Sequence, residues 1–147
     1  MYRKGVSGLV MNDNQEFLLV NLESFNLKYF AVPGGGVEPG EELERAIYRE
    51  LDEELGLKED SLELVGRSQV PVLFKFKAIT MECDGVAYEG SERYFFGFRF
   101  VGSDHEIYQK DGEVRTYKWV PVSELKHYLL FDNQLEQTIE KIEEMFS

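Results

Sequence analysis

The segment from Pro33 to Leu57 constrains the fold of this chain more than any other stretch of its sequence. It begins with Pro33-Gly34-Gly35-Gly36, where the proline fixes one φ angle and the glycines free the next three, so a turn is expected there. Residues 41–55 follow with helical periodicity, after Pro39-Gly40, with acids in the first turn and Gly56 where a helix ends. A glycine loop that leads into one well-bounded helix is therefore the predicted centre of the fold.

Short runs rich in β-branched and aromatic residues lie on both sides of this helix. They cover residues 6–11, 16–22, 29–32, 62–65, 69–79, 93–101 and 115–120. A second helix is predicted over residues 132–146, capped by Asp132 or Asn133, because one helical face gathers Leu135, Ile139, Ile142 and Phe146. Many strands and two principal helices predict an α+β or layered α/β/α architecture.

The length of 147 residues suits one domain, predicted to span residues 1–147, because no repeat or linker divides the chain. Hydrophobic residues make up 43% of the chain and aromatic residues 14%, enough to bury a core. The single cysteine, Cys83, cannot form an intramolecular disulfide, and no apolar run resembles a secretion signal or a membrane span. These features predict a cytoplasmic protein that does not contact a membrane.

The net charge of −12 is concentrated in one part of the sequence. Residues 38–63 supply −8 of it, from eleven acidic and three basic side chains. Such a chain repels phosphate backbones and anionic membranes, so no stable complex with nucleic acid is expected. A polyanionic ligand therefore has to be bridged by a positively charged group.

The helix over residues 41–55 places carboxylates within its own apolar stripe. At about 100° per residue, Glu50 and Glu54 fall among Leu43, Ala46 and Ile47, with Glu53 close by. A solvated helix face would hold its acids opposite the core, so three crowded carboxylates at the border of a buried surface indicate a counter-ion. Carboxylate oxygens suit Mg²⁺, with Mn²⁺ as a substitute.

The same segment resembles the signature of a known family, the Nudix hydrolases. Nine positions over 23 residues fit the Nudix box in order: Gly35, Glu41, Arg49, Glu50, Leu51, Glu53, Glu54, Gly56 and Leu57. The resemblance implies an α/β fold, the Nudix α/β/α sandwich with a mixed β-sheet. It also implies metal-dependent hydrolysis of a phosphoanhydride bond in a nucleoside diphosphate linked to another group, X.

Roles carried over by position follow from this resemblance. Glu50, Glu53 and Glu54 are implied as metal ligands, with the Gly35 carbonyl as a backbone ligand. Arg49 is implied as a support that fixes the carboxylates through bidentate pairs, and Glu41 as a further support. An intact box favours turnover over the alternative of a non-catalytic nucleotide-binding module.

The water that attacks the anhydride has to lose a proton to a base. Glu53 is the first choice within the box, and Glu113 is the strongest candidate from a later loop. Which glutamate acts as the base stays open at the level of sequence.

Five short segments outside the box carry a second resemblance: Tyr2-Arg3, residues 30–36 before the predicted helix, Arg93-Tyr94-Phe95, Glu113 ahead of Lys118-Trp119-Val120, and Phe131 before the last helix. In these segments the chain is similar to the bacterial dinucleoside polyphosphate hydrolases and the related RNA 5′-pyrophosphohydrolases. This similarity implies that Glu113 approaches the metal. The resemblance implies that Arg3 contacts phosphate and that Phe131 stacks on a base. The predicted substrate is a small nucleotide-type molecule, with an RNA 5′ end or a dinucleoside polyphosphate as the best guess. A nucleoside triphosphate pyrophosphohydrolase, a nucleotide-sugar hydrolase and a homodimeric assembly stay open.

Overall fold

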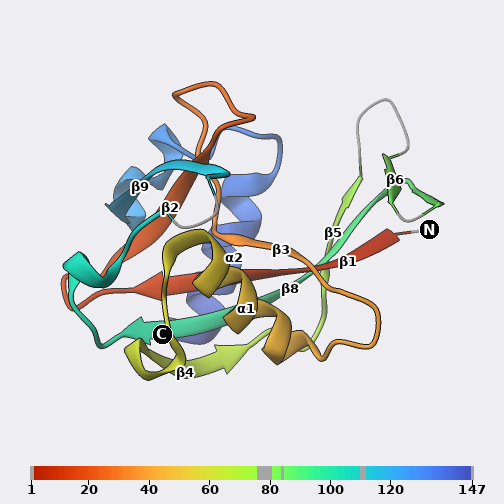
Figure 1. Cartoon of the computed structure of the whole chain (residues 1–147). Helices are drawn as coiled ribbons and strands as arrows, with labels where there is room; N and C mark the ends of the chain where they lie inside the picture. Colours follow the sequence, from red (N-terminus) through yellow and green to blue (C-terminus); the bar gives the residue numbers. More distant parts are fainter. Residues whose placement is uncertain (1, 76–80, 84, 110–111, 147) are drawn as a thin grey trace.

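The centre of the computed structural model is a mixed β-sheet, and the structure describes residues 2–75, 81–83, 85–109 and 112–146 (Figure 1). The strands are β1 (Tyr2–Met11), β2 (Glu16–Leu22), β3 (Gly34–Gly36), β4 (Leu62–Arg67), β5 (Val72–Lys75), β6 (Met81–Cys83), β7 (Val86–Tyr88), β8 (Gly90–Phe100) and β9 (Val114–Pro121). The α-helices are α1 (Leu43–Leu55) and α2 (Gln134–Phe146), and 3₁₀ turns cover Glu59–Ser61, Asp104–Glu106 and Val122–His127.

The main sheet has the order β4-β8-β1-β2-β9, and β3 and β5 extend it by pairing with β1 and β8. β1 and β8 run parallel along the whole of β1, from Tyr2 opposite Gly90 to Met11 opposite Arg99. The other pairs are antiparallel. The prediction of a mixed sheet is therefore confirmed.

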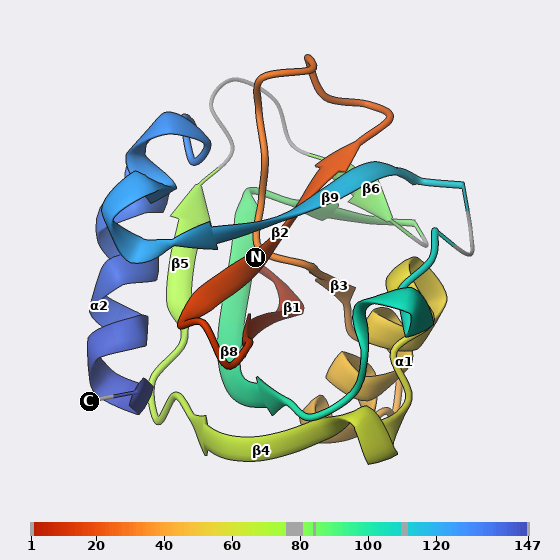
Figure 2. The same ribbon diagram turned by 90° about the vertical axis from the view of Figure 1, so that its left-hand side faces the viewer.

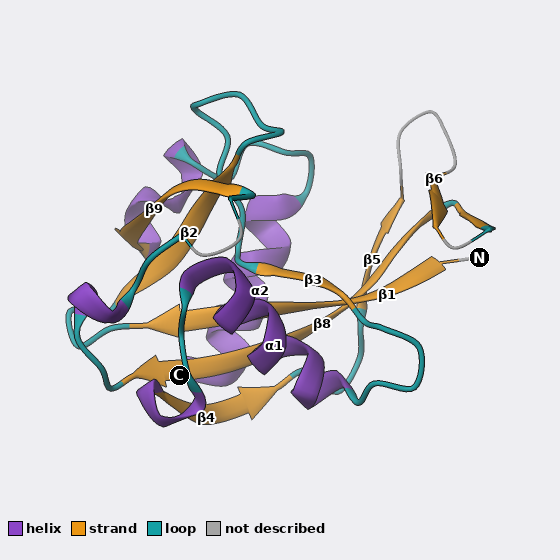
Figure 3. Ribbon diagram, viewed as in Figure 1, coloured by secondary structure: helices purple, strands orange, loops and turns teal. Residues whose placement is uncertain are grey.

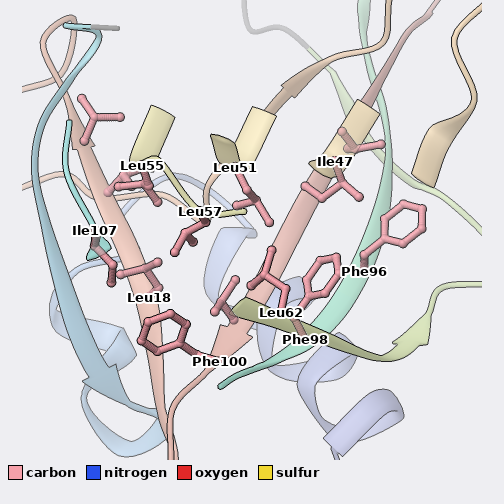
Figure 4. Close-up of a cluster of buried hydrophobic side chains, with 14 of the residues drawn as sticks. Leu18, Ile47, Leu51, Leu55, Leu57, Leu62, Phe96, Phe98, Phe100 and Ile107 are labelled. Atoms are coloured by element: carbon pink, nitrogen blue, oxygen red, sulfur yellow. The ribbon is translucent and has the colours of Figure 1, made fainter. Parts of the chain in front are cut away.

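Helix α1 covers one face of this sheet with the apolar stripe that its periodicity predicts. Ile47, Leu51 and Leu55 are fully buried. Figure 4 shows Ile47 and Leu51 on the side of the cluster that holds Phe96 and Phe98 of β8, and Leu55 on the side that holds Leu18 and Ile107. Each such side chain contributes about 1.5–3 kcal/mol by leaving water, so the position of α1 on the sheet is firmly held.

Helix α2 covers the opposite face, and the sheet lies between the two helices (Figures 2 and 3). Ile142 of α2 belongs to the cluster formed there by Leu9, Phe17 and Phe95. Phe146 meets the ring of Phe17 edge-on at 5.2 Å between ring centroids. The predicted α/β/α sandwich is confirmed.

The glycine run before α1 is a strand, whereas the sequence predicted only a turn there. Gly34–Gly36 pairs antiparallel with β1, with Gly36 opposite Gly5. A chain without Cβ atoms can lie against the free edge of β1, and the backbone hydrogen bonds gained there favour the extended form. The strand predicted over residues 29–32 was wrong, because only Ala31 forms an isolated bridge, to Val20.

Several predicted boundaries shift by a few residues. α1 begins at Leu43 because Glu42 is extended (φ −75°, ψ 147°), and α2 begins at Gln134 because Asn133 is left-handed (φ 64°). β1 starts at Tyr2, before the predicted residue 6. Of the run predicted over residues 69–79, Val72–Lys75 is a strand, and residues 76–79 lie outside the described residues. Gly56 ends α1 in the left-handed conformation (φ 67°), as predicted.

Neither of the two α-helices that the structure describes has the length and apolar character needed to cross a membrane.

Candidate active site

Strand β3 runs beside α1 (Figure 1). It separates two sets of charged side chains. A Cβ atom at Gly35 would lie 2.4–2.5 Å from the Glu50 carboxylate, which comes from α1. A Cβ atom at Gly36 would lie 2.5 Å from the guanidinium of Arg3, which comes from β1. Since successive residues of a strand face opposite sides, the two glycines admit a carboxylate on one face and a guanidinium on the other.

Two of the three box glutamates are withdrawn from solvent. Glu54 is 4% exposed, and the Glu50 side chain is 14% exposed. Burial raises the pKa of Glu50 above its ordinary value, although Arg49 and a hydrogen bond with Glu54 oppose this shift. The Glu53 side chain is 51% exposed, at the outer border of the group. The ionised form of carboxylates that lie this close together and this far from solvent is stabilised by a neighbouring positive charge.

Arg49 supplies that charge and connects the box residues. Its Nε and Nη2 donate to the two Glu41 carboxylate oxygens (2.7 and 2.9 Å), and Nη2 also donates to the Gly36 carbonyl (3.0 Å). Nη1 donates to Glu50 (3.0 Å) and Glu53 (3.2 Å). The hydrogen bonds from Arg49 lower the pKa of Glu41, and those to Glu41 raise the pKa of Arg49. One guanidinium thus ties α1 to the loop before it.

The donor set fits a divalent cation. Among the described residues, no three carboxylate, histidine or cysteine side chains already converge into a cation site. The Glu50 carboxylate nevertheless lies directly against the backbone of Gly35, in space that a Cβ would fill. Carboxylate and carbonyl oxygens are the ligands that Mg²⁺ and Mn²⁺ prefer.

A second arginine, Arg93 of β8, lies with Arg3 on the other side of β3. Its guanidinium is 3.3 Å from the position of a Cβ at Gly5, and its Nη1 donates to the Val6 carbonyl (2.8 Å). Burial lowers the pKa of Arg93, while the nearby carboxylates of Glu54 and Glu50 raise it. An arginine stays charged under such opposing effects, so this side of β3 is positive.

A cavity of about 260 Å³, which we call the first cavity, opens beside Arg93. It lies on the α2 side of the sheet and has mainly apolar walls with a few polar side chains. Its lining consists of Ser7, Phe25, Ala31, Val32, Phe74, Ser91, Arg93, Phe95, Phe131, Asp132, Gln134 and Thr138. Such a composition is typical of sites that bind flat organic groups.

A second cavity, of about 590 Å³, adjoins the first and shares Phe74, Phe131 and Asp132 with it. Its remaining lining consists of Tyr29, Leu73, Lys75, Leu130, Asn133 and Gln137. The two cavities are therefore neighbours, with Arg93 in the wall of the first and Lys75 in the wall of the second.

The two predicted substrate residues, Arg3 and Phe131, lie on the α2 side of the sheet, and Glu113 was predicted as a metal ligand or base. Phe131 is 41% exposed and lines both cavities. Glu113 precedes β9 with an exposed side chain, and its carbonyl accepts a hydrogen bond from the Glu23 amide (2.8 Å). These contacts connect the Glu113 backbone to the loop after β2, and the approach of its carboxylate to the box glutamates stays a prediction.

Arg93 is the site residue to which the sequence analysis gave no role. The signal available was an arginine inside an otherwise aromatic strand, Arg93-Tyr94-Phe95-Phe96. A charged residue in such a strand is rare unless it is paired or functional.

We predict that Gly35→Ala lowers kcat/KM by at least ~10-fold, an effect typical of misplacing a metal ligand. The added methyl group would overlap the Glu50 carboxylate and displace it. Thermal melting and steady-state kinetics measure the effect. Gly66→Ala in β4 is the control, because its Cβ would meet only the flexible Met145 side chain at 3.2 Å. Equal activity of the two variants would contradict the placement of Glu50.

Comparison with known proteins agrees with this geometry. Residues 1–142 match the family model of the NUDIX domain. The chain is 32% identical to an RNA pyrophosphohydrolase of Erythrobacter litoralis, over 82% of this chain and 78% of that one. It is 30% identical to an RNA pyrophosphohydrolase of Pelagibacter ubique, over 84% and 78%.

Solved structures show the same fold. The E. coli dihydroneopterin triphosphate pyrophosphohydrolase superposes with a TM-score of 0.75 at 20% identity, over 96% of each chain. The C. elegans Ap4A hydrolase superposes with a TM-score of 0.70 at 16% identity, over 97% of this chain and 99% of that one.

The chain belongs to the Nudix family. It is an enzyme that hydrolyses pyrophosphate bonds in nucleotide-type substrates, and enzymes of this family use divalent metal ions.

Proposed function

We propose that this enzyme uses Mg²⁺ to hydrolyse the 5′-triphosphate end of RNA or a dinucleoside polyphosphate. The observation that carries the proposal is the arrangement around β3. Carboxylates for a cation lie on one face, and guanidinium groups for phosphate lie on the other, next to a mainly apolar cavity.

Glu50, Glu53 and Glu54 are the residues that would hold the cation, with the Gly35 carbonyl beside them. When bound, the cation neutralises phosphate charge and lowers the pKa of water. Arg49 fixes the positions of Glu50 and Glu53 through its hydrogen bonds, which keeps their oxygens directed toward the same place. Arg3 and Arg93 bind phosphate oxygens from the other side of β3 and offset the repulsion expected from a chain of net charge −12.

The first cavity would take the base of the nucleotide next to the reacting phosphates. Its rings, Phe74, Phe95 and Phe131, provide stacking surfaces, and Asp132 and Gln134 provide hydrogen-bonding groups. The adjoining second cavity, where Lys75 contributes a positive charge, favours a substrate with more than one nucleoside. The names of the sequence relatives favour RNA as that substrate.

A panel of substrates tests this proposal. Nucleoside triphosphates, dinucleoside polyphosphates, nucleotide sugars and 5′-triphosphorylated RNA are incubated with Mg²⁺ or Mn²⁺, and products are identified by mass. We expect the highest kcat/KM with the RNA end or a dinucleoside polyphosphate. A preference for nucleoside triphosphates or nucleotide sugars would contradict the substrate assignment.

A cytoplasmic location stays a prediction from the cysteine content.

Glu113 is the proposed alternative to Glu53 as the base that accepts the proton of the attacking water. We predict that Glu113→Gln lowers kcat by at least ~100-fold with little change in KM, because a general base typically contributes 10²–10⁴-fold. Glu124→Gln makes the same charge change at another exposed position and should leave kcat unchanged. Steady-state kinetics would refute this role of Glu113 if both variants turned over equally fast.

A further inference from the structure

We infer that Asn21 and Arg115 are positioning residues that hold the aromatic wall of the two cavities. The inference rests on the proposed function, in which these cavities bind the nucleotide. It assigns a task to two polar side chains outside the Nudix box.

Asn21 is a completely buried polar side chain in β2, at 0% exposure. Burial of an amide is unfavourable unless its polar atoms are hydrogen bonded. Its Nδ2 donates to the carbonyls of Asn26 (2.9 Å) and Tyr29 (2.7 Å), and its Oδ1 accepts from Arg115 Nη1 (2.9 Å). Both amide hydrogens are thus committed to the loop that follows β2.

Arg115 of the neighbouring strand β9 completes this connection. Its Nη2 donates to the carbonyl of Glu23 (3.1 Å), and the Glu23 carboxylate lies 3.7 Å from the same guanidinium. Two side chains from the sheet therefore bind three backbone carbonyls of one loop, those of Glu23, Asn26 and Tyr29. A loop held at its start, middle and end has one preferred conformation.

The loop from Glu23 to Tyr29 carries two of the aromatic rings that enclose Phe131. Phe25 meets the ring of Phe131 edge-on at 5.1 Å between centroids, and Tyr29 does so at 4.9 Å. Phe25 lines the first cavity, Tyr29 lines the second, and Phe131 lines both. The conformation of this loop therefore determines the position of the Phe131 ring and the width of both cavities.

This arrangement separates substrate binding from the chemical step. Neither Asn21 nor Arg115 is among the residues that line the two cavities. Loosening the loop should weaken binding of the nucleotide base and leave the carboxylates on α1 in place. The Glu23 amide keeps its hydrogen bond to the Glu113 carbonyl (2.8 Å), so the backbone of that candidate general base should stay in place as well. The expected signature is a higher KM at an unchanged kcat, which a general loss of folding would not produce.

The test replaces Arg115 by methionine, which keeps an unbranched apolar stem and removes the hydrogen bonds to Asn21 and Glu23. With the best substrate of the panel, we expect Arg115→Met to raise KM by about 10-fold and to change kcat less than twofold. Arg99→Met is the matched control, because Arg99 of β8 is half exposed and only meets Asp13 and Glu63 at 3.9 and 3.7 Å. Asn21→Leu, which keeps the branched shape of the side chain but removes its hydrogen bonds, should reproduce the rise in KM.

A double-mutant cycle shows whether the effect passes through the aromatic wall. The rise in KM caused by Arg115→Met should disappear in a Phe131→Ala background, because coupled residues are not additive. Additive effects, or a fall in kcat at constant KM, would overturn the inference.

Equilibrium binding of adenosine 5′-(α,β-methylene)diphosphate with Mg²⁺ gives a readout independent of turnover. Its Kd should rise by about 10-fold in Arg115→Met. An unchanged Kd and KM in an enzyme that turns over would overturn the positioning role alone. An unaltered protein that neither binds this probe nor hydrolyses any substrate would overturn the proposed function and, with it, this inference.

Discussion

Replacing Glu53 by glutamine is expected to lower kcat by at least ~100-fold while the protein keeps its fold, because the change removes a metal ligand or a general base. The Glu53 side chain is 51% exposed and contributes no core volume. Arg49 keeps its bonds to Glu41 and to the Gly36 carbonyl, so the loop before α1 remains attached. Steady-state kinetics at saturating Mg²⁺ measures the loss.

Binding of Mn²⁺, followed by electron paramagnetic resonance, distinguishes the two roles of Glu53. A ligand would show weaker Mn²⁺ binding together with the loss of kcat, whereas a base would show the loss of kcat alone. Glu44→Gln is the control on the same helix, since the one ion pair of Glu44 among the described residues is with Arg45, at 3.9 Å. Wild-type turnover by Glu53→Gln would remove Glu53 from the reaction.

The carboxylate side of the site is predictable because it is local. Glu50 and Glu54 come from one helix, and helical periodicity alone places them among buried leucines. Glu41 and Arg49 are eight residues apart and meet through a loop whose proline and glycines mark the turn. Because these residues are close in sequence and lie on a regular helix, their clustering can be predicted from the sequence.

The arginine side of the site, which we propose binds phosphate, depends on long-range pairing. Arg93 reaches the Val6 carbonyl from 87 positions away, because β8 lies parallel to β1. No local pattern fixes which strands become neighbours or in which register. The same holds for Phe25 and Phe131. Phe25 follows β2 and Phe131 precedes α2, so their contact depends on the packing of α2 against the sheet.

Replacing Arg49 by lysine should lower kcat/KM by about 10–100-fold, the range typical of residues that orient metal ligands. Lysine carries the same charge but lacks the planar fork that binds both Glu41 oxygens and still reaches Glu50. We also expect weaker Mn²⁺ binding, because Glu50 and Glu53 lose their common partner. Arg45→Lys is the matched control, four residues earlier on α1, where the side chain is 51% exposed and pairs with Glu59. Equal kinetics of the two variants would contradict the role of Arg49.

The same substitution has a consequence for stability whose pH dependence follows from Glu41. Its hydrogen bonds from Arg49 lower the pKa of Glu41 in the folded protein. A carboxylate of this kind stabilises the fold above its unfolded pKa, and that contribution is lost as the pH falls through the lower, folded value. Arg49→Lys should therefore reduce Tm at pH 7, and the difference in Tm from the wild type should shrink below pH ~4, near the ordinary carboxyl pKa. Calorimetry at both pH values measures it, and a difference in Tm that does not change with pH would show that Arg49 stabilises the protein through packing rather than through Glu41.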